Sequence, residues 1–302
     1  MTATEQQNAR IRIDLASLIS LGNLAAQLRL KHRLKPARMS GQRLSPHKGR
    51  GMVFEETRPY QAGDDVRHID WRVTARTGQT HSKLFREERE TPVLIGVDYR
   101  LSMQFATRGV FKTVQAAKLA GILAWSALHE HERVGGQIFT DHGYQIVKPQ
   151  LGRTALLHFL QALVSPNLHQ TQQTFTLADQ LIRLGRYAYP GTRIYIISDF
   201  RGFNTECENQ IRELSRKCDL SLIQIFDPLE ARLPERGDYR FTDGQTFRLI
   251  QTADSAIRQR YAQRFQNHQQ QLRDLCRKLR INWQSFSTHQ EMDTTCLTKT
   301  FS

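Results

Sequence analysis

The chain has 302 residues, 39% of them hydrophobic and 24% charged, which suits one large globular domain or two of ordinary size. Its longest uncharged, mostly apolar run, Leu119–Leu128, is about half the roughly 20 residues that a membrane-spanning helix needs, which argues against a transmembrane segment. The net charge of +14 favours an acidic partner, whether nucleic acid, an anionic membrane surface or an acidic protein.

The amino-terminal 50 residues are strongly basic, with ten Lys or Arg residues against Glu5 and Asp14. Within them, Ile11–Leu34 carries apolar residues at spacings of three and four, which predicts an amphipathic helix broken or weakened near Gly22. Its basic side suits a helix that lies on the next domain, and a membrane-surface helix would look similar. Arg38–Gly51 has little to bury, so we expect a loop there.

The segment Phe54–Arg76 is dense in opposite charges, with aromatic residues between them. Charges mixed so closely usually pair with one another, so we expect a structural salt-bridge network with a turn at Gly63. An alternative is a metal site for phosphoester hydrolysis built from the three aspartates of this segment. The residues of the network are Arg58, Tyr60, Asp64, Asp65, Arg67, Asp70, Trp71 and Arg72, and the three aspartates are Asp64, Asp65 and Asp70.

From residue 80 onward, short apolar runs alternate with helical patterns, which predicts an α/β protein with a doubly wound, mostly parallel sheet. A hairpin is expected at Tyr239–Gln251, turned at Asp243–Gly244. The expected strands are Thr80–Glu90, Val93–Val97, Arg133–Phe139, Tyr144–Val147, a strand opened by Gly191 and Thr192 that ends at Asp199, Leu220–Phe226 and Ile281–Phe286. The expected helices are Lys112–Glu130, Thr154–Val164, Leu177–Tyr187, Asn204–Lys217, Ser255–Arg280 and Thr294–Phe301.

Two of the apolar runs end in an aspartate, Asp98 and Asp199. In a parallel α/β sheet the carboxyl ends of the strands form a rim where ligands bind, so we expect both carboxylates at this rim. Asp98 also begins a D-x-R-x-S spacing with Arg100 and Ser102. A simpler alternative is that the two aspartates only cap helices.

The four cysteines form no C-x-x-C pair and have no histidine at zinc-finger spacing. The chain also shows no apolar signal segment behind a basic start. We therefore expect reduced thiols in a cytoplasmic protein.

Three strings, KGRGMVFEETRPYQAGDDVRHIDWRVTAR, KLFREERE and VLIGVDYRLSM, resemble the bacterial domain-of-unknown-function family fifty-eight, DUF58. The resemblance covers most of residues 40–290. Members carry a von Willebrand factor A-type domain, so the resemblance implies a Rossmann-like domain over residues 91–302 with a hairpin insertion near 227–252. Residues 1–90 would then hold the amino-terminal helix and the charged family segment, packed on that domain.

Many von Willebrand A domains bind a divalent cation such as Mg²⁺ through a D-x-S-x-S loop, a threonine from a second loop and an aspartate from a third. By this resemblance Asp98 and Ser102 match the first loop and Asp199 matches the third. The best-placed threonines are Thr174 and Thr176, with Thr154 as the runner-up.

Arg100 replaces the middle serine of that loop, and a guanidinium has no lone pair for a metal. One possibility is a metal-free ion-pair cluster in which Arg100 takes the cation position between Asp98 and Asp199. The other is that Arg100 points outward and Mg²⁺ binds with one ligand fewer, completed by water.

Members of the family are commonly encoded beside MoxR-type AAA+ ATPases and are thought to act with them. The resemblance thus implies a non-enzymatic adaptor for such an ATPase and an unknown client protein, with Asp98, Arg100, Ser102 and Asp199 as partner-binding residues. The chain has no G-x-x-x-x-G-K-[ST], H-E-x-x-H or G-x-S-x-G motif, which agrees with this reading. The alternatives are the phosphoester hydrolase and a nucleic-acid-binding basic arm, although no known nucleic-acid motif is present.

Overall fold

The computed structural model describes residues 8–26, 52–61, 63–87, 91–170, 174–235, 237–242 and 247–292. The chain forms two compact units: Met1–Ala37 together with Thr91–Ser302, called the α/β unit, and Arg38–Glu90, called the small unit. The boundary at residue 90 agrees with the expected one, but the amino-terminal residues belong with the α/β unit and not with the small unit. The predicted loop Arg38–Gly51 and helix Thr294–Phe301 lie outside the described residues, as does most of the basic arm.

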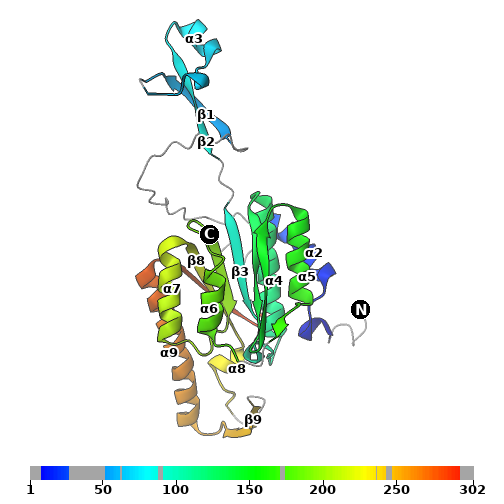
Figure 1. Ribbon diagram of the computed structural model, residues 1–302. Helices are drawn as coiled ribbons and strands as arrows, with labels where there is room; N and C mark the ends of the chain where they lie inside the picture. The colour runs from blue at the N-terminus through cyan, green and yellow to red at the C-terminus, as the bar shows by residue number, and fades with distance from the viewer. Residues whose placement is uncertain are drawn as a thin grey trace. The chain divides into compact units, whose positions relative to one another are not determined.

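A seven-stranded sheet of order β11-β8-β7-β3-β4-β5-β6 forms the centre of the α/β unit (Figure 1). The first five strands in this order pair in parallel, whereas β5 and β6 are antiparallel. The predicted fold class, α/β with a mostly parallel sheet, is therefore confirmed. The strands are β3 (Pro92–Asp98), β4 (Arg133–Phe139), β5 (Gly143–Gln150), β6 (His169–Gln170), β7 (Arg193–Ser198), β8 (Asp219–Phe226) and β11 (Asn282–Ser287).

Helices cover both faces of this sheet, which explains why its central strands are apolar runs without alternation. In β3, Val93 and Ile95 belong to the core on one face, and Leu94 belongs to the core on the other. The first core contains residues of α2 (Leu15–Ala26), α4 (Lys112–His129) and α5 (Arg153–Val164). The second contains residues of α6 (Leu177–Gly185), α7 (Thr205–Lys217) and α9 (Ser255–Leu279).

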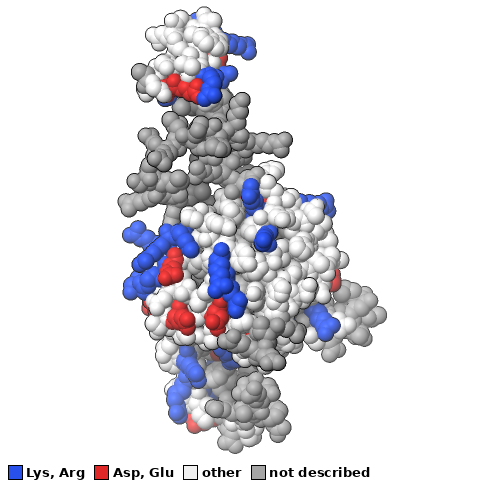
Figure 2. All heavy atoms as spheres, in the orientation of Figure 1, with Lys and Arg blue, Asp and Glu red and all other residues white. Residues whose placement is uncertain are grey.

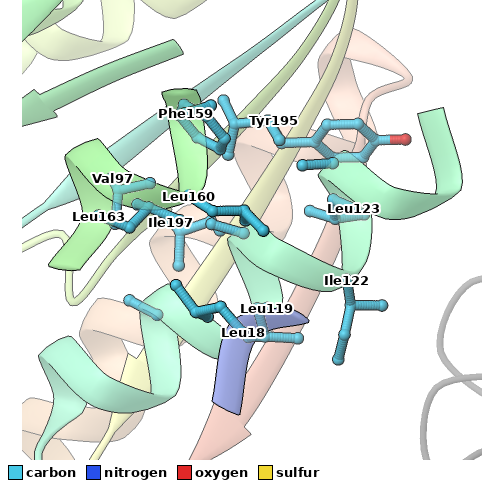
Figure 3. Packing of buried hydrophobic residues seen from close by; sticks show 14 of the residues in the cluster. Leu18, Val97, Leu119, Ile122, Leu123, Phe159, Leu160, Leu163, Tyr195 and Ile197 are labelled. Carbon is cyan, nitrogen blue, oxygen red and sulfur yellow. The ribbon is translucent and has the colours of Figure 1, made fainter. Parts of the chain in front are cut away.

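The amino-terminal helix α2 packs on α4, so its expected contact with the next domain is present. The fully buried Leu18 of α2 lies in the same cluster as Leu119 of α4 (Figure 3). The predicted break near Gly22 is wrong, since α2 continues through this residue. A side chain at Gly22 would come within 3.2 Å of the Trp125 ring, so the glycine allows close helix packing.

The small unit contains an antiparallel pair of strands, β1 (Met52–Pro59) and β2 (His81–Glu87), joined by the turn η1 (Val66–His68) and the short helix α3 (Trp71–Thr77). The second strand agrees with the predicted Thr80–Glu90. The first strand, β1, was not predicted, because its charged residues interrupt the apolar pattern that indicates a strand.

A second antiparallel pair, β9 (Asp238–Thr242) and β10 (Phe247–Gln251), occupies the expected hairpin position after the short helix α8 (Pro228–Ala231). Every helix in the described parts of the chain is too short or too polar to serve as a membrane-spanning segment.

Candidate functional site

The carboxyl ends of the neighbouring strands β3 and β7 carry the two aspartates that the sequence singles out. Asp98 is the last residue of β3, and Asp199 follows Ser198, the last residue of β7. Pairing of Val97 with Ile197 brings these strand ends together. Asp98 and Asp199 therefore share one rim of the sheet, as parallel strands require.

Arg100 binds the Asp98 carboxylate at several points. Its Nε donates to both carboxylate oxygens at 3.1 Å, its Nη2 donates to Oδ2 at 2.7 Å, and its backbone N donates to Oδ1 at 2.9 Å. The Ser198 hydroxyl donates to the same Oδ2 at 2.6 Å. Because Nη2 also lies 3.8 Å from Oδ1 of Asp199, one guanidinium forms ion pairs with two carboxylates.

A second cation, Lys112, lies on the other oxygen of Asp199. Its Nζ is 2.9 Å from Asp199 Oδ2 and 2.7 Å from Oε1 of Glu230, and its side chain is 0% exposed. Lys112 comes from the first turn of α4 and Glu230 from α8, so separate elements meet here. Neither residue was predicted, because a lysine in an alanine-rich helix carries no sequence signal of burial.

Burial and ion pairing shift the pKa values of the two rim carboxyls in opposite directions. Burial raises the pKa of Asp98, although Arg100 and the Ser198 hydroxyl oppose this rise. Burial by itself would also raise the pKa of Asp199, but Lys112, a backbone amide and Arg100 together hold it below its usual range. Burial would lower the pKa of Arg100, and the carboxylates raise it overall, so the guanidinium stays charged.

The predicted second-loop threonines serve other purposes. The Thr176 hydroxyl donates to Asp179 Oδ2 at 2.8 Å and accepts from the Asp179 N–H at 3.2 Å, which forms a capping box at the start of α6. Thr174 and Thr154 are exposed. None of the rim hydrogen bonds described above comes from these threonines.

The rim side chains do not fit a divalent cation. The Asp98 carboxylate offers about four lone-pair sites, yet Arg100 and Ser198 already make five contacts with it. The Ser102 Oγ is buried and has no hydrogen-bond partner, but it is a single weak ligand. In the part of the chain that the structure describes, no group of three or more His, Cys, Asp or Glu residues is arranged to hold a metal ion.

The sequence signature of the family described as "Protein of unknown function DUF58" matches residues 56–271, which is most of the chain. The chain belongs to the DUF58 family. Two uncharacterized relatives, Mb1516 of Mycobacterium bovis and Rv1480 of Mycobacterium tuberculosis, are each 27% identical to this DUF58 protein over 225 residues. In each case the match covers 74% of this chain and 71% of the relative.

Three solved structures resemble this DUF58 protein weakly. The conserved hypothetical protein BatB from Bacteroides thetaiotaomicron has a TM-score of 0.45 at 15% identity, covering 69% of this chain and 96% of its own. An aerotolerance-related membrane protein from Bacteroides fragilis has a TM-score of 0.43 at 15% identity, covering 70% and 96%. A von Willebrand factor type A structure from Catenulispora acidiphila has a TM-score of 0.33 at 13% identity, covering 49% and 35%.

A third rim aspartate of the DUF58 protein, Asp227, was not predicted from the sequence. It follows β8, is fully buried, and accepts hydrogen bonds from Thr107 Oγ1 at 2.5 Å and Thr288 Oγ1 at 2.7 Å. It also forms a capping box with Glu230 at α8. The signal was present, because Leu220–Phe226 is another apolar run that ends in an aspartate, and D-P-L-E has the spacing of a capping box.

The aspartates of the small unit each have a separate local partner. Asp64 accepts from Arg58 Nη2 at 2.7 Å. Asp65 caps η1 and accepts from Arg67 Nη2 at 2.6 Å, and the hydrogen bonds from Arg67 lower the pKa of its carboxyl to about 2. Basic and acidic side chains accordingly lie side by side in this unit (Figure 2).

The remaining residues of the predicted network also act locally. Asp70 accepts from the backbone N–H of Arg72 at 3.1 Å and so caps α3. The Tyr60 hydroxyl donates to the Asp64 carbonyl at 3.2 Å, whereas Trp71 is 70% exposed. The three aspartates are therefore used in separate contacts and do not converge on one point, which leaves the proposed hydrolase without a metal site in the described residues.

The charged groups of the rim are covered, whereas the loop above them is not. Asp98 is fully buried, and Arg100 and Asp199 are each 7% exposed. Leu101, the next residue after Arg100, is 55% exposed, and its backbone N–H donates to Asp141 Oδ2 at 2.8 Å. A partner at this rim would therefore meet the loop that the charges hold in place before it met the charges themselves.

Proposed function

We propose that this DUF58 protein is a cytoplasmic, non-enzymatic adaptor that binds a partner protein at the rim of its α/β unit. The observation that carries the proposal is the internal pairing of the rim carboxylates. Asp98 and Asp199 both accept from cations of the same chain, so neither is free to act as a base or as a metal ligand. Chemistry at this rim would require breaking buried ion pairs, whereas protein binding would not.

The loop held by these pairs supports the same proposal. Arg100 is fixed by Asp98, the N–H of Leu101 is fixed by Asp141, and Met103 is fully buried. The exposed Leu101 side chain is thus presented on a rigid turn. A surface that is ordered before binding loses less conformational entropy when a partner docks, which favours affinity.

The proposed partner is a MoxR-type AAA+ ATPase, as the family resemblance implies, and the proposed role is the maturation or remodelling of a client protein complex. The adaptor would supply the contact surface, and the ATPase would supply the energy. The net charge of +14 suits a partner with an acidic surface, because complementary charge speeds association and excludes wrong partners.

The test measures binding of the full chain to a purified MoxR-type ATPase from the same organism. Leu101→Asp should weaken binding by roughly tenfold or more, since it replaces the exposed apolar side chain of the rim loop by a charge. The matched control is Leu151→Asp. Leu151 is 46% exposed in the same unit, but it follows β5 at the opposite end of the sheet.

The proposal requires the two variants to differ in their affinity for the ATPase. If both bind like the parent chain, or if both lose binding equally, the rim does not contact the ATPase. Circular dichroism of both variants establishes that the fold is retained.

A further inference from the structure

We infer that the rim contains a latent site for a small divalent cation of the Mg²⁺ or Mn²⁺ class, which the guanidinium of Arg100 closes. The inference deepens the proposed adaptor function, because it implies that the rim binds its partner without a bridging metal. Three observations support it: the place of the guanidinium, its enclosure by neighbouring strand ends, and an oxygen atom left without a partner.

The guanidinium lies where a cation shared by two carboxylates would lie. Its Nη2 is 2.7 Å from Asp98 Oδ2 and 3.8 Å from Asp199 Oδ1, and these carboxylates come from different strands. A metal ion between the same oxygens would need the Asp98 lone pairs that now accept from Arg100. The two cations therefore exclude each other at this position.

The loop after β7 lies against this side chain. A Cβ placed on Gly202 would be in ordinary van der Waals contact with Nη1 of Arg100, at 3.9 Å. The Phe139 ring at the end of β4 lies 6.0 Å from the guanidinium carbon on another side. Arg100 is consequently enclosed by parts of three strand ends and is only 7% exposed, which is the setting of a built-in ion pair and not of a mobile surface arginine.

The atom left without a partner is the hydroxyl oxygen of Ser102. It is buried and makes no hydrogen bond, although buried polar groups are usually paired. Ser198 Oγ, Asp98 and Asp199 provide further oxygens at the same rim. Oxygen atoms of this kind suit a hard divalent cation once the guanidinium is removed.

The experiment removes only the guanidinium. Arg100→Ser should bind Mn²⁺ with one-to-one stoichiometry, seen as loss of the free Mn²⁺ signal in electron paramagnetic resonance, and its Tm should rise with added Mn²⁺. The parent chain should show neither effect at millimolar Mn²⁺. Arg100→Lys keeps a positive charge and should also bind no Mn²⁺, and adding Asp98→Asn to Arg100→Ser should abolish the gain.

Stoichiometric Mn²⁺ binding by the parent chain would overturn the inference, as would a folded Arg100→Ser chain that binds none. An Arg100→Ser chain that folds only with Mn²⁺ would support it, and one that folds neither with nor without the metal would count against it. Because these measurements use this chain alone, their outcome is independent of whether the MoxR-type ATPase binds.

Discussion

The aspartates of the small unit have only local arginine partners, whereas those of the rim also have partners from distant parts of the chain. Asp64 and Asp65 pair with arginines six and two residues away. Asp98 also pairs with an arginine two residues away, but it accepts in addition from Ser198 across 100 residues, and Asp199 pairs with Lys112 from 87 residues away. The first group shapes local turns, whereas the second also joins separate strands and helices.

The two groups also differ in exposure, and this changes what each pair contributes. An exposed pair adds little to stability, because water already solvates both charges. A buried pair adds little net stability when complete, but the loss of one partner leaves the other charge buried and unpaired. Removal of one member should therefore be costly at the rim and nearly neutral in the small unit.

The largest effect should come from Lys112→Met. Asp199 and Glu230 would lose their shared buried cation, so we expect the free energy of unfolding to fall by about 3–5 kcal/mol. Urea denaturation followed by circular dichroism measures this value. Lys217→Met, an exposed lysine in the last turn of α7, should change it by less than about 0.5 kcal/mol. Equal effects of the two changes would contradict the distinction between the buried and the exposed lysine.

A somewhat smaller effect is expected from Asp98→Asn, which keeps the shape of the side chain but removes the charge facing Arg100. We expect a loss of about 2–4 kcal/mol, because Arg100 would keep only Asp199 at 3.8 Å. The counterpart in the small unit is Asp64→Asn, whose pair with Arg58 is partly exposed and should cost less than about 1 kcal/mol. Thermal unfolding of the two variants compares their losses of stability. A larger loss of stability for Asp64→Asn than for Asp98→Asn would contradict the expectation.

The ionisation of Asp227 should make the free energy of unfolding depend on pH. Burial by itself would raise the pKa of its carboxyl, but hydrogen bonds from Thr107, the Leu229 amide and Thr288 hold it below the ordinary 3.8. A carboxyl with a lower pKa in the folded chain stabilises the fold above pH 3.8, and this contribution is lost as the pH falls through the folded value.

Asp227→Asn should consequently cost about 1.5–3 kcal/mol at neutral pH, through the loss of charge-assisted hydrogen bonds. The difference between the variant and the parent chain should shrink as the pH falls below 3.8. Urea unfolding across this pH range measures it. A difference that is constant with pH would show that the carboxyl is not ionised in the fold.

The smallest effect should come from Thr176→Ala, which removes the capping hydroxyl of α6. The expected loss is about 1 kcal/mol, typical of a helix cap. Thr174→Ala, two residues earlier and exposed, should leave the midpoint of unfolding unchanged. A measurable loss from Thr174→Ala with none from Thr176→Ala would mean that the capping assignment is wrong.

Several parts of the fold and of the rim could be predicted from local sequence. Apolar runs ending in Asp98 and Asp199 placed two strand ends correctly, because strand periodicity and termination are local properties. The same rule applied to Leu220–Phe226 would have found Asp227. The pairing of Asp65 with Arg67 could be expected from their spacing alone, since they are two residues apart.

The burial of Lys112 against Asp199 and Glu230 could not be predicted in this way. Residues 112, 199 and 230 belong to a helix, a loop after a strand and a short helix, and nothing local to any of them indicates the other two. The expectation that Asp98, Arg100, Ser102 and Asp199 bind a partner stays a prediction. The burial of Asp98, Arg100 and Asp199 could not be foreseen from residue type, whereas the neighbouring Leu101 is exposed.

By itself, the sequence determined the fold class, the family and the local pairing of opposite charges, since each depends on patterns within a few residues of one another. Only the tertiary structure decided which charges are buried together, because the partner of a buried ion is set by how strands and helices pack. At the rim this packing places one guanidinium and one ammonium among three carboxylates contributed by distant parts of the chain.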